Sequence, residues 1–315
     1  MRYLSALCVL SALVAASACG RLVTKGVVVD SSFEPFIPAD TKVLAGVQFT
    51  KLQGAPLYRA HKEQLDLGQL QAFSERTGLN PMRELSEILI TWDGTHYLAM
   101  ARGHFSQAKV GPKLESLGAR RRSYKNYTLF GGDRNSLVFM REGLLVAGSS
   151  QALRDLIDRG NKSEAGIPAE LQPRLENIPK ADQLWVVSRG GLPVNGIAMR
   201  SDIDSALSNI VGYVSNAAIG VAIDTGIHLQ ADLTCISDQG AQRVRDALRG
   251  GIGLARLTTK DNQLELLRLY DSVHVDQEKS AIHVRADVAP DLADKLFSYI
   301  PRMKNGAGRM FERVP

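Results

Sequence analysis

A pair of histidines near the end of the chain has the spacing that metal chemistry needs. His274 and His283 lie in a stretch that reads as a β-hairpin. If Glu278 and Lys279 form its turn, the two imidazoles face each other with Cβ atoms about 5 Å apart. Imidazole binds zinc, copper, iron and nickel, and Asp276 is near enough in sequence to be a further ligand. This spacing predicts a metal site, and with it a metal-dependent hydrolase as one hypothesis for the function.

The same side chains also fit the polar face of a hairpin that is exposed to water. A metal site needs further ligands and a shell of groups that orient them, and only Asp276 is a candidate for this. The corresponding earlier hairpin, residues 136–148, contains no histidine. Metal binding and a solvated face therefore both remain open, and any metal would be bound by one part of the chain only.

A cluster of positive charge lies in the first half of the chain. It consists of Arg120, Arg121, Arg122 and Lys125, with Tyr124 and Tyr127 interleaved. Residues 121–130 read as a strand, and a row of charges on an edge strand blocks pairing with other chains. The alternative is a contact with anionic lipid head groups or cell-wall polymers.

No other motif carries specific chemistry. Gly250-Gly251-Ile252-Gly253 lies inside a helical pattern and is not followed by Gly-Lys-Ser/Thr, so it is not a phosphate-binding loop. The Gly-x-Ser-x-Gly and His-Glu-x-x-His motifs do not occur. The sequence therefore names no catalytic residue, and it leaves enzymatic activity open while favouring a protein that is not an enzyme.

The beginning of the chain predicts export from the cytoplasm. Residues 1–18 combine a charged start, an apolar run from Leu4 to Ala16 and small residues at the end, which is the layout of a secretory signal peptide. The apolar run is shorter than the roughly 20 residues of a membrane-spanning helix. We therefore expect this segment to be removed, so that the mature protein starts at Cys19 outside the cytoplasm.

Cys19 resembles the cysteine that is acylated in bacterial lipoproteins. Ala16-Ser17-Ala18 fits the rule for ordinary signal peptidase, and a cysteine directly after the cleavage site fits lipoprotein processing. Lipoprotein signals usually have leucine where this chain has Ala16. The prediction is a lipid on Cys19 that anchors the protein to a membrane, the outer one if the host has one. Secretion or a periplasmic location without lipid is the alternative.

The composition is that of a globular protein. Of the 315 residues, 44% are hydrophobic and 23% charged, with a net charge of +5. This charge is mild for the length and no motif that reads DNA or RNA is present, so we expect no nucleic-acid partner. We predict no cofactor apart from the lipid and the hypothetical metal. Cys8 would be removed with the signal peptide and Cys19 would carry the lipid, so Cys235 has no partner for an internal disulfide. It is expected to be a buried apolar residue.

The chain divides into segments of different character. After the signal peptide, the sequence indicates a tether at 19–40, a first half at 41–160, a linker at 161–182, a second half at 183–300 and a basic, disordered tail at 301–315. Prolines and polar residues mark the tether and the linker. Each half runs strand, helix, hairpin, helix, hairpin, helix, and this recurrence indicates that one unit was duplicated.

Turn residues indicate the fold class. Asp93-Gly94 and Glu142-Gly143 separate apolar runs in the first half, and Asp224-Thr225-Gly226 does so in the second. Antiparallel hairpins interleaved with amphipathic helices are typical of the α+β class. We therefore predict an α+β fold with two related halves, each of antiparallel β-hairpins packed against helices on one face.

Three segments resemble a known group of proteins. They are PADTKVLAGVQFTKLQGAPLYR, GLLVAGSSQALRDLID and ADLTCISDQGAQRVRDALRGGIGLARL. They are similar to segments of bacterial secreted or lipid-anchored proteins with a duplicated α+β fold and no assigned activity, and the likeness covers most of residues 41–300. The resemblance implies the fold and export, and it supplies no functional residue.

The leading hypothesis is a non-enzymatic lipoprotein of the cell envelope. It would act as a binding or assembly module, held to a membrane through the lipid on Cys19, with an envelope protein or polymer as its partner. The alternatives are a metal-dependent hydrolase that uses His274 and His283, and a binder of anionic lipid or cell-wall polymer.

Overall fold

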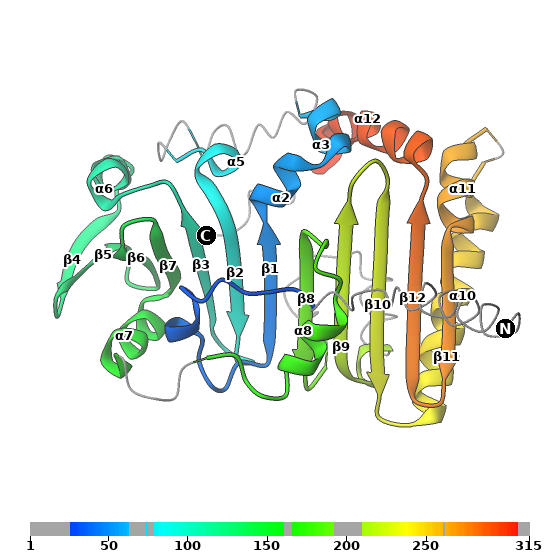
Figure 1. Ribbon diagram of the computed structural model, residues 1–315, viewed down its shortest axis with the longest axis horizontal. Coiled ribbons are helices and arrows are strands. Elements are labelled where there is room, and N and C mark those ends of the chain that lie inside the picture. The colour runs from blue at the N-terminus through cyan, green and yellow to red at the C-terminus, as the bar shows by residue number, and fades with distance from the viewer. Residues whose placement is uncertain are drawn as a thin grey trace, which may run out of the picture.

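One antiparallel sheet forms the centre of the molecule. The computed structural model describes residues 26–62, 74, 79–160, 166–191, 210–260 and 262–307. Within them, twelve strands follow the order β11-β12-β10-β9-β8-β1-β2-β3-β7-β6-β5-β4 (Figure 1). Residues 1–25, with the predicted signal peptide and Cys19, lie outside the described residues.

The strands are short to medium in length. They are β1 (Val43–Gln48), β2 (Leu85–Trp92), β3 (Tyr97–Gly103), β4 (Arg120–Tyr124), β5 (Tyr127–Gly131), β6 (Asn135–Arg141), β7 (Leu144–Ser149), β8 (Leu184–Arg189), β9 (Val214–Ile223), β10 (Ile227–Cys235), β11 (Val273–Glu278) and β12 (Ala281–Val288). The predicted hairpins β2–β3, β6–β7, β9–β10 and β11–β12 are all present.

Helices connect and cover these strands. They are α2 (Phe49–Gly54), α3 (Pro56–His61), α5 (Pro81–Glu84), α6 (Gln107–Ser116), α7 (Ser150–Arg159), α8 (Gln172–Asn177), α10 (Asp238–Thr258), α11 (Leu264–Asp271) and α12 (Pro290–Ala307), with a 3-10 turn at Glu34–Phe36. Helix α10 is continuous through Gly250 and Gly253. The α+β class is therefore confirmed.

The two halves meet at the middle of the sheet. β1 and β8 pair there, with Val43 opposite Ser188. Outward from this pair, β2, β3, β7 and β6 on one side correspond in order to β9, β10, β12 and β11 on the other. The first half has one additional hairpin, β4–β5, at its outer edge. Duplication of one unit would produce this order, in which the halves share a single sheet.

Helices cover both faces of the sheet. Side chains of a strand alternate between its faces. On β3, Met100 belongs to the main core with the apolar side of α7, whereas Ala101 belongs to a second core with α6. On β9, Ala218 belongs to the main core, whereas Ala217 packs in the core under α10. The prediction of helices on one face is therefore wrong, because neighbouring strand positions are apolar on both faces.

The segment predicted as a tether is folded into the main core from residue 26 onward. Val27, Val29, Phe33 and Ile37 are buried there, and the last two are fully inaccessible to water. Pro35 lies in the 3-10 turn rather than in an extended tether. Apolar residues at these four positions gain more from burial against the sheet than an exposed tether would allow.

The segment predicted as a linker also contributes to the core. Helix α8 lies within it and begins at the turn that contains Pro173. Leu171, Leu175 and Ile178 are almost completely buried in the main core. Residues 166–182 are therefore a packed element on the front face in Figure 1, and their prolines shape the start of a helix.

Two other elements differ in extent from the prediction. Residues 121–130 form two strands instead of one, because Lys125 adopts a left-handed φ of 50° and turns the chain between β4 and β5. Helix α12 continues to Ala307, past the predicted start of the tail at residue 301. Residues 308–315 lie outside the described residues.

Candidate functional site

The structure does not place the two predicted metal ligands opposite each other. His274 faces Arg285, and His283 faces Asp276. The turn is one residue later than predicted, and Lys279 adopts a left-handed φ of 51° within it. The predicted register is wrong by two residues, which keeps every side chain on its expected face. Alternation of apolar residues cannot distinguish two registers that differ in this way.

His283 belongs to a row of polar side chains across three strands. Its Nδ1 lies 2.6 Å from the Asp232 carboxylate of β10, and Asp276 lies opposite on β11. Asp276 also lies 3.5 Å from the Arg249 guanidinium. Within the described residues, no group of three or more His, Cys, Asp or Glu side chains is arranged to hold a metal ion. The row therefore has the contacts of a solvated polar face.

The predicted basic cluster lies at the outer edge of the sheet, on β4 and its turn. Each cation has a carboxylate nearby: Asp133 is 2.8 Å from Arg122 and 3.9 Å from Arg120, Glu115 is 3.9 Å from Arg121, and Asp158 is 2.6 Å from Lys125. These acidic neighbours offset much of the positive charge that an anionic ligand would need. The position fits the edge-strand interpretation.

Cys19 and Cys235 differ in what the structure shows. Cys19 lies outside the described residues. Cys235 is buried in the core under α10, and burial raises the pKa of its thiol. A thiol whose thiolate form is disfavoured is a weak nucleophile, so Cys235 has the environment of a packing residue.

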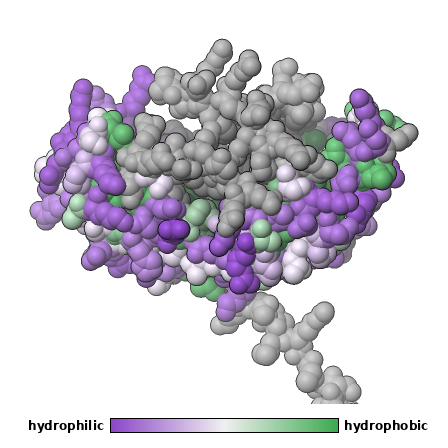
Figure 2. All heavy atoms as spheres, turned by 90° about the horizontal axis from the view of Figure 1, so that it is seen from above, coloured by the Kyte–Doolittle hydropathy of each residue, from purple (hydrophilic) through white to green (hydrophobic). Residues whose placement is uncertain are grey.

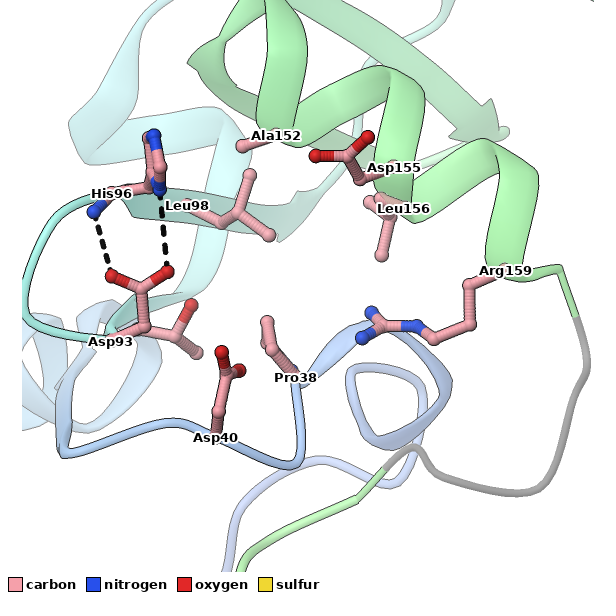
Figure 3. Close-up of a pocket in the computed structure, with 10 residues that line it drawn as sticks. Pro38, Asp40, Asp93, His96, Leu98, Ala152, Asp155, Leu156 and Arg159 are labelled. Atoms are coloured by element: carbon pink, nitrogen blue, oxygen red, sulfur yellow. Dashed lines mark hydrogen bonds and ion pairs between the residues drawn. The ribbon is translucent and has the colours of Figure 1, made fainter.

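A small cavity lies beside the β2–β3 turn and helix α7 (Figure 3). Its volume is about 160 Å³, and its polar lining includes Asp40, Asp93, His96, Asp155 and Arg159. Ligand pockets usually measure about 300 Å³ or more. The cavity therefore suits water molecules or a small ion better than an organic substrate.

Asp93 organises the turn beside this cavity. Its carboxylate accepts hydrogen bonds from the backbone N–H groups of Thr95 and His96, at 2.6 and 2.7 Å, and the His96 ring lies 3.5 Å away. Burial raises the pKa of Asp93, but these hydrogen bonds outweigh burial and lower it overall. The turn is thus a loop of residues 93–96 built around a carboxylate, rather than the predicted two-residue turn. Asp93 has a structural role in it.

Two carboxylates near the centre of the sheet have strongly raised pKa values and do not stand out in the sequence. Burial and the nearby Asp30 carboxylate raise the pKa of Glu87 on β2 to about 7. Burial raises the pKa of Asp182, just before β8, to about 6. One oxygen of each, Glu87 Oε1 and Asp182 Oδ2, is buried without a hydrogen-bond partner among the described residues.

Lys51 on α2 is the cation that influences both carboxylates. Its charge lowers the pKa of Glu87 and that of Asp182. The Lys51 ammonium donates a hydrogen bond of 2.6 Å to the Lys180 carbonyl, and burial lowers its own pKa. Of Lys51, Glu87 and Asp182, only Glu87 could have been found from the sequence. It precedes the apolar run of β2, and the alternation of side chains along a strand places it on the face of the main core.

Apolar side chains are exposed where α10 and α11 meet, at the outer end of the second half (Figure 2). Leu254, Leu257 and Leu264 have exposed fractions of 64%, 85% and 61%. We call these three residues the leucine surface. Isolated exposed leucines are ordinary, whereas a group of them is typical of surfaces that contact another molecule.

Comparison with known proteins gives a distant structural likeness. No protein-family model and no curated protein matches the chain. Crystal form III of TP0453 is similar over 85% of this chain and 97% of that chain, with 10% identity and a TM-score of 0.47. Crystal form IV of TP0453 gives 84%, 96%, 9% identity and a TM-score of 0.45.

Among the described residues, none of the helices is long and apolar enough to cross a membrane.

Proposed function

We propose that the protein is a non-enzymatic module of the cell envelope that binds another protein, with its N-terminus tethered to a membrane through acylated Cys19. The leucine surface is the observation that supports binding. Burial of three leucines against a partner would remove a large apolar area from water and favour association. The signal sequence supports the location.

The charges around the leucine surface favour a protein as its binding partner. Arg256 pairs with Asp271, Arg268 with Asp291 at 2.7 Å, and Lys295 with Glu265 at 3.2 Å. Positive and negative groups are therefore mixed around the apolar centre. An apolar centre with a polar rim of both signs resembles a protein interface, whereas an anionic membrane surface attracts an excess of cations.

Site-specific photo-crosslinking in the producing cell tests this proposal. A crosslinker in place of Leu257 should give one major protein adduct, whereas a crosslinker in place of Leu117, which is 42% exposed and directly follows α6, should not. The partner, identified by mass spectrometry and purified, should bind the Leu257→Asp variant at least about tenfold more weakly than wild type, because central apolar contacts dominate interfaces. Leu117→Asp should bind normally.

Three outcomes would overturn the proposed binding role. They are adducts to lipid alone, adducts to a second copy of this chain alone, and equal affinity of the Leu257→Asp variant and wild type for the purified partner. The anchor is tested separately by palmitate labelling of wild type and Cys19→Ala. Equal labelling of the two would contradict acylation of Cys19, and the proposed binding role of the leucine surface would not be affected.

A further inference from the structure

The first described segment of the chain lies on the sheet as a strap. The strap, residues 26–37, crosses the sheet in front of β1 and β2 in Figure 1. The Val27 N–H donates a 3.0 Å hydrogen bond to the Ile178 carbonyl at the end of α8, and the Val27 and Phe33 side chains are buried. The strap therefore connects the predicted anchor at Cys19 to the main core.

Polar contacts fix the middle of the strap to β1, β2 and β3. The Gln48 side chain donates to the Val28 carbonyl at 3.3 Å. The Asp30 carboxylate accepts from the Arg102 guanidinium at 2.9 Å. The Asp30 backbone N–H in turn donates to the Glu87 carboxylate. Glu87 is thus, beside Gln48, a second point at which the sheet holds the backbone of the strap.

The surroundings of Glu87 are unfavourable for a negative charge. Its Oε1 is buried and has no hydrogen-bond partner among the described residues. The Asp30 carboxylate, which belongs to the strap itself, is close enough to repel it. A buried carboxylate with an unpaired oxygen and an anionic neighbour is stabilised by taking up a proton. Lifting the strap would remove both Asp30 and part of the burial.

We propose that the strap is a proton-controlled latch, which is held tightly on the sheet when Glu87 is protonated and loosens when Glu87 is ionised. The latch would set how much chain is free between the anchor and the folded body. It goes beyond the proposed binding role and does not depend on acylation of Cys19, because all of its contacts lie within the described residues.

The other charged groups near Glu87 do not cancel this effect. The hydrogen bond from the Asp30 N–H, Lys51 on α2 and Arg102 on β3 favour its ionised form. Burial and the charge of the Asp30 carboxylate outweigh them, and the resulting pKa is about 7. Arg141 on β6 acts on Asp30, and Lys180 acts on Lys51. Asp182 also acts on Lys51, and His228 on β10 acts on Asp182, so this second acid requires a control of its own.

Hydrogen exchange at the strap tests the latch. We compare the full chain at pH 6 and pH 8, with the exchange of residues 27–30 corrected for the intrinsic rate. If the pKa of Glu87 is about 7 with the strap closed and returns to 4.5 with the strap open, the opening equilibrium should rise about tenfold over this range. In Glu87→Gln, opening should be independent of pH and roughly 30-fold rarer than in wild type at pH 6, because Glu87 is already ionised at that pH when the strap is open.

Asp182→Asn is the matched control, because it removes the other carboxylate with a raised pKa and should leave the pH dependence of the strap intact. A flat wild-type profile, or an unchanged profile in Glu87→Gln, would overturn the proposal. If Glu87→Gln fails to fold, a spin label on Val28→Cys in the otherwise wild-type chain decides, since Val28 is 59% exposed. Its mobility should rise from pH 6 to pH 8, and constant mobility would contradict the latch.

Discussion

The His283 ring lies 2.6 Å from the Asp232 carboxylate, across the neighbouring strands β12 and β10. Both side chains are more than a third exposed, so the pair lies on a face of the sheet that is open to water. The carboxylate occupies Nδ1 and leaves a single imidazole nitrogen for any other ligand. Asp276 lies opposite but is within reach of Arg249, which competes for its oxygens.

From this arrangement we expect purified protein to retain much less than one equivalent of zinc after dialysis. Functional zinc sites have three or four protein ligands, and His283 with Asp232 supplies too few of them. Elemental analysis of wild type and His283→Ala measures this. His228→Ala is the control, because His228 pairs in the same way with Asp287 at 2.8 Å. Stoichiometric zinc that is lost only in His283→Ala would revive the metal-dependent hydrolase hypothesis.

Arg122 should stabilise the protein more than its neighbour Arg121. The Arg122 guanidinium donates to the Asp133 carboxylate at 2.8 Å, to the Ser136 hydroxyl at 3.3 Å and to the Gly132 carbonyl. Loss of these bonds in Arg122→Ala should lower the free energy of unfolding by about 1 to 2 kcal/mol. Arg121→Ala should change it by less than about 0.5 kcal/mol, because a surface pair at 3.9 Å contributes little.

Urea unfolding of the two variants at one pH and one salt concentration measures the difference. Equal losses of stability would show that the cluster acts through its total charge rather than through the specific bonds of Arg122. In that case the interpretation of this strand as a binder of anionic polymers or lipids would gain support.

Local signals in the sequence were sufficient to predict most strands of the sheet. The turns at Glu142-Gly143 and at residues 224–226 are present, because glycine and aspartate there determine the backbone locally. The sequence could not show that β1 and β8 pair, because this contact joins residues far apart in the chain. Nor could it show that Val27 and Leu175 belong to one core, since proline and polar residues around them resemble those of exposed segments.

The candidate sites were harder to predict than the elements. The register of the last hairpin depends on which residue turns the chain, and Lys279, which does so, has no special propensity for a left-handed conformation. Asp182 becomes a buried acid only because the strands bring it over Gly220. Burial of a single polar side chain depends on tertiary packing, and it leaves no periodic pattern in the sequence.

Asp182→Asn should stabilise the protein at pH 8 and leave its stability almost unchanged near pH 4. The folded protein raises the pKa of Asp182 from 3.8 to about 6, so the folded state binds the proton more tightly than the unfolded state. Stability is therefore lost as the pH rises through this range, and the variant avoids the loss. With allowance for solvent screening, the gain at pH 8 should be about 1 kcal/mol, or about 2 °C in Tm.

Thermal unfolding at pH 4 and pH 8 measures this gain, with Asp155→Asn, an exposed carboxylate on α7, as the control. A variant that is less stable than wild type at pH 8 would show that the attraction between Asp182 and Lys51 exceeds the cost of burying the charge. The sign of the stability difference between the variant and wild type at pH 8 therefore shows whether the attraction to Lys51 or the cost of burying the charge is larger.

Gly46→Ala should be among the more damaging small substitutions in the sheet. Gly46 lies on β1 opposite Trp185 of β8, and a Cβ atom at this position would lie 2.3 Å from carbons of the indole ring. Trp185 is only 2% exposed, so its ring has no free space into which it could move. Overpacking of this kind costs about 1 to 3 kcal/mol. Urea unfolding of the variant measures the loss.

Gly54→Ala is the control, because a Cβ atom at Gly54 would have no neighbour within 4 Å. Its effect should stay within about 0.5 kcal/mol. If the indole ring causes the loss, Gly46→Ala should cost clearly less in a Trp185→Leu background, because the smaller side chain leaves room for the added methyl group. An equal cost in both backgrounds would mean that the backbone of β1, and not the contact with Trp185, requires glycine at position 46.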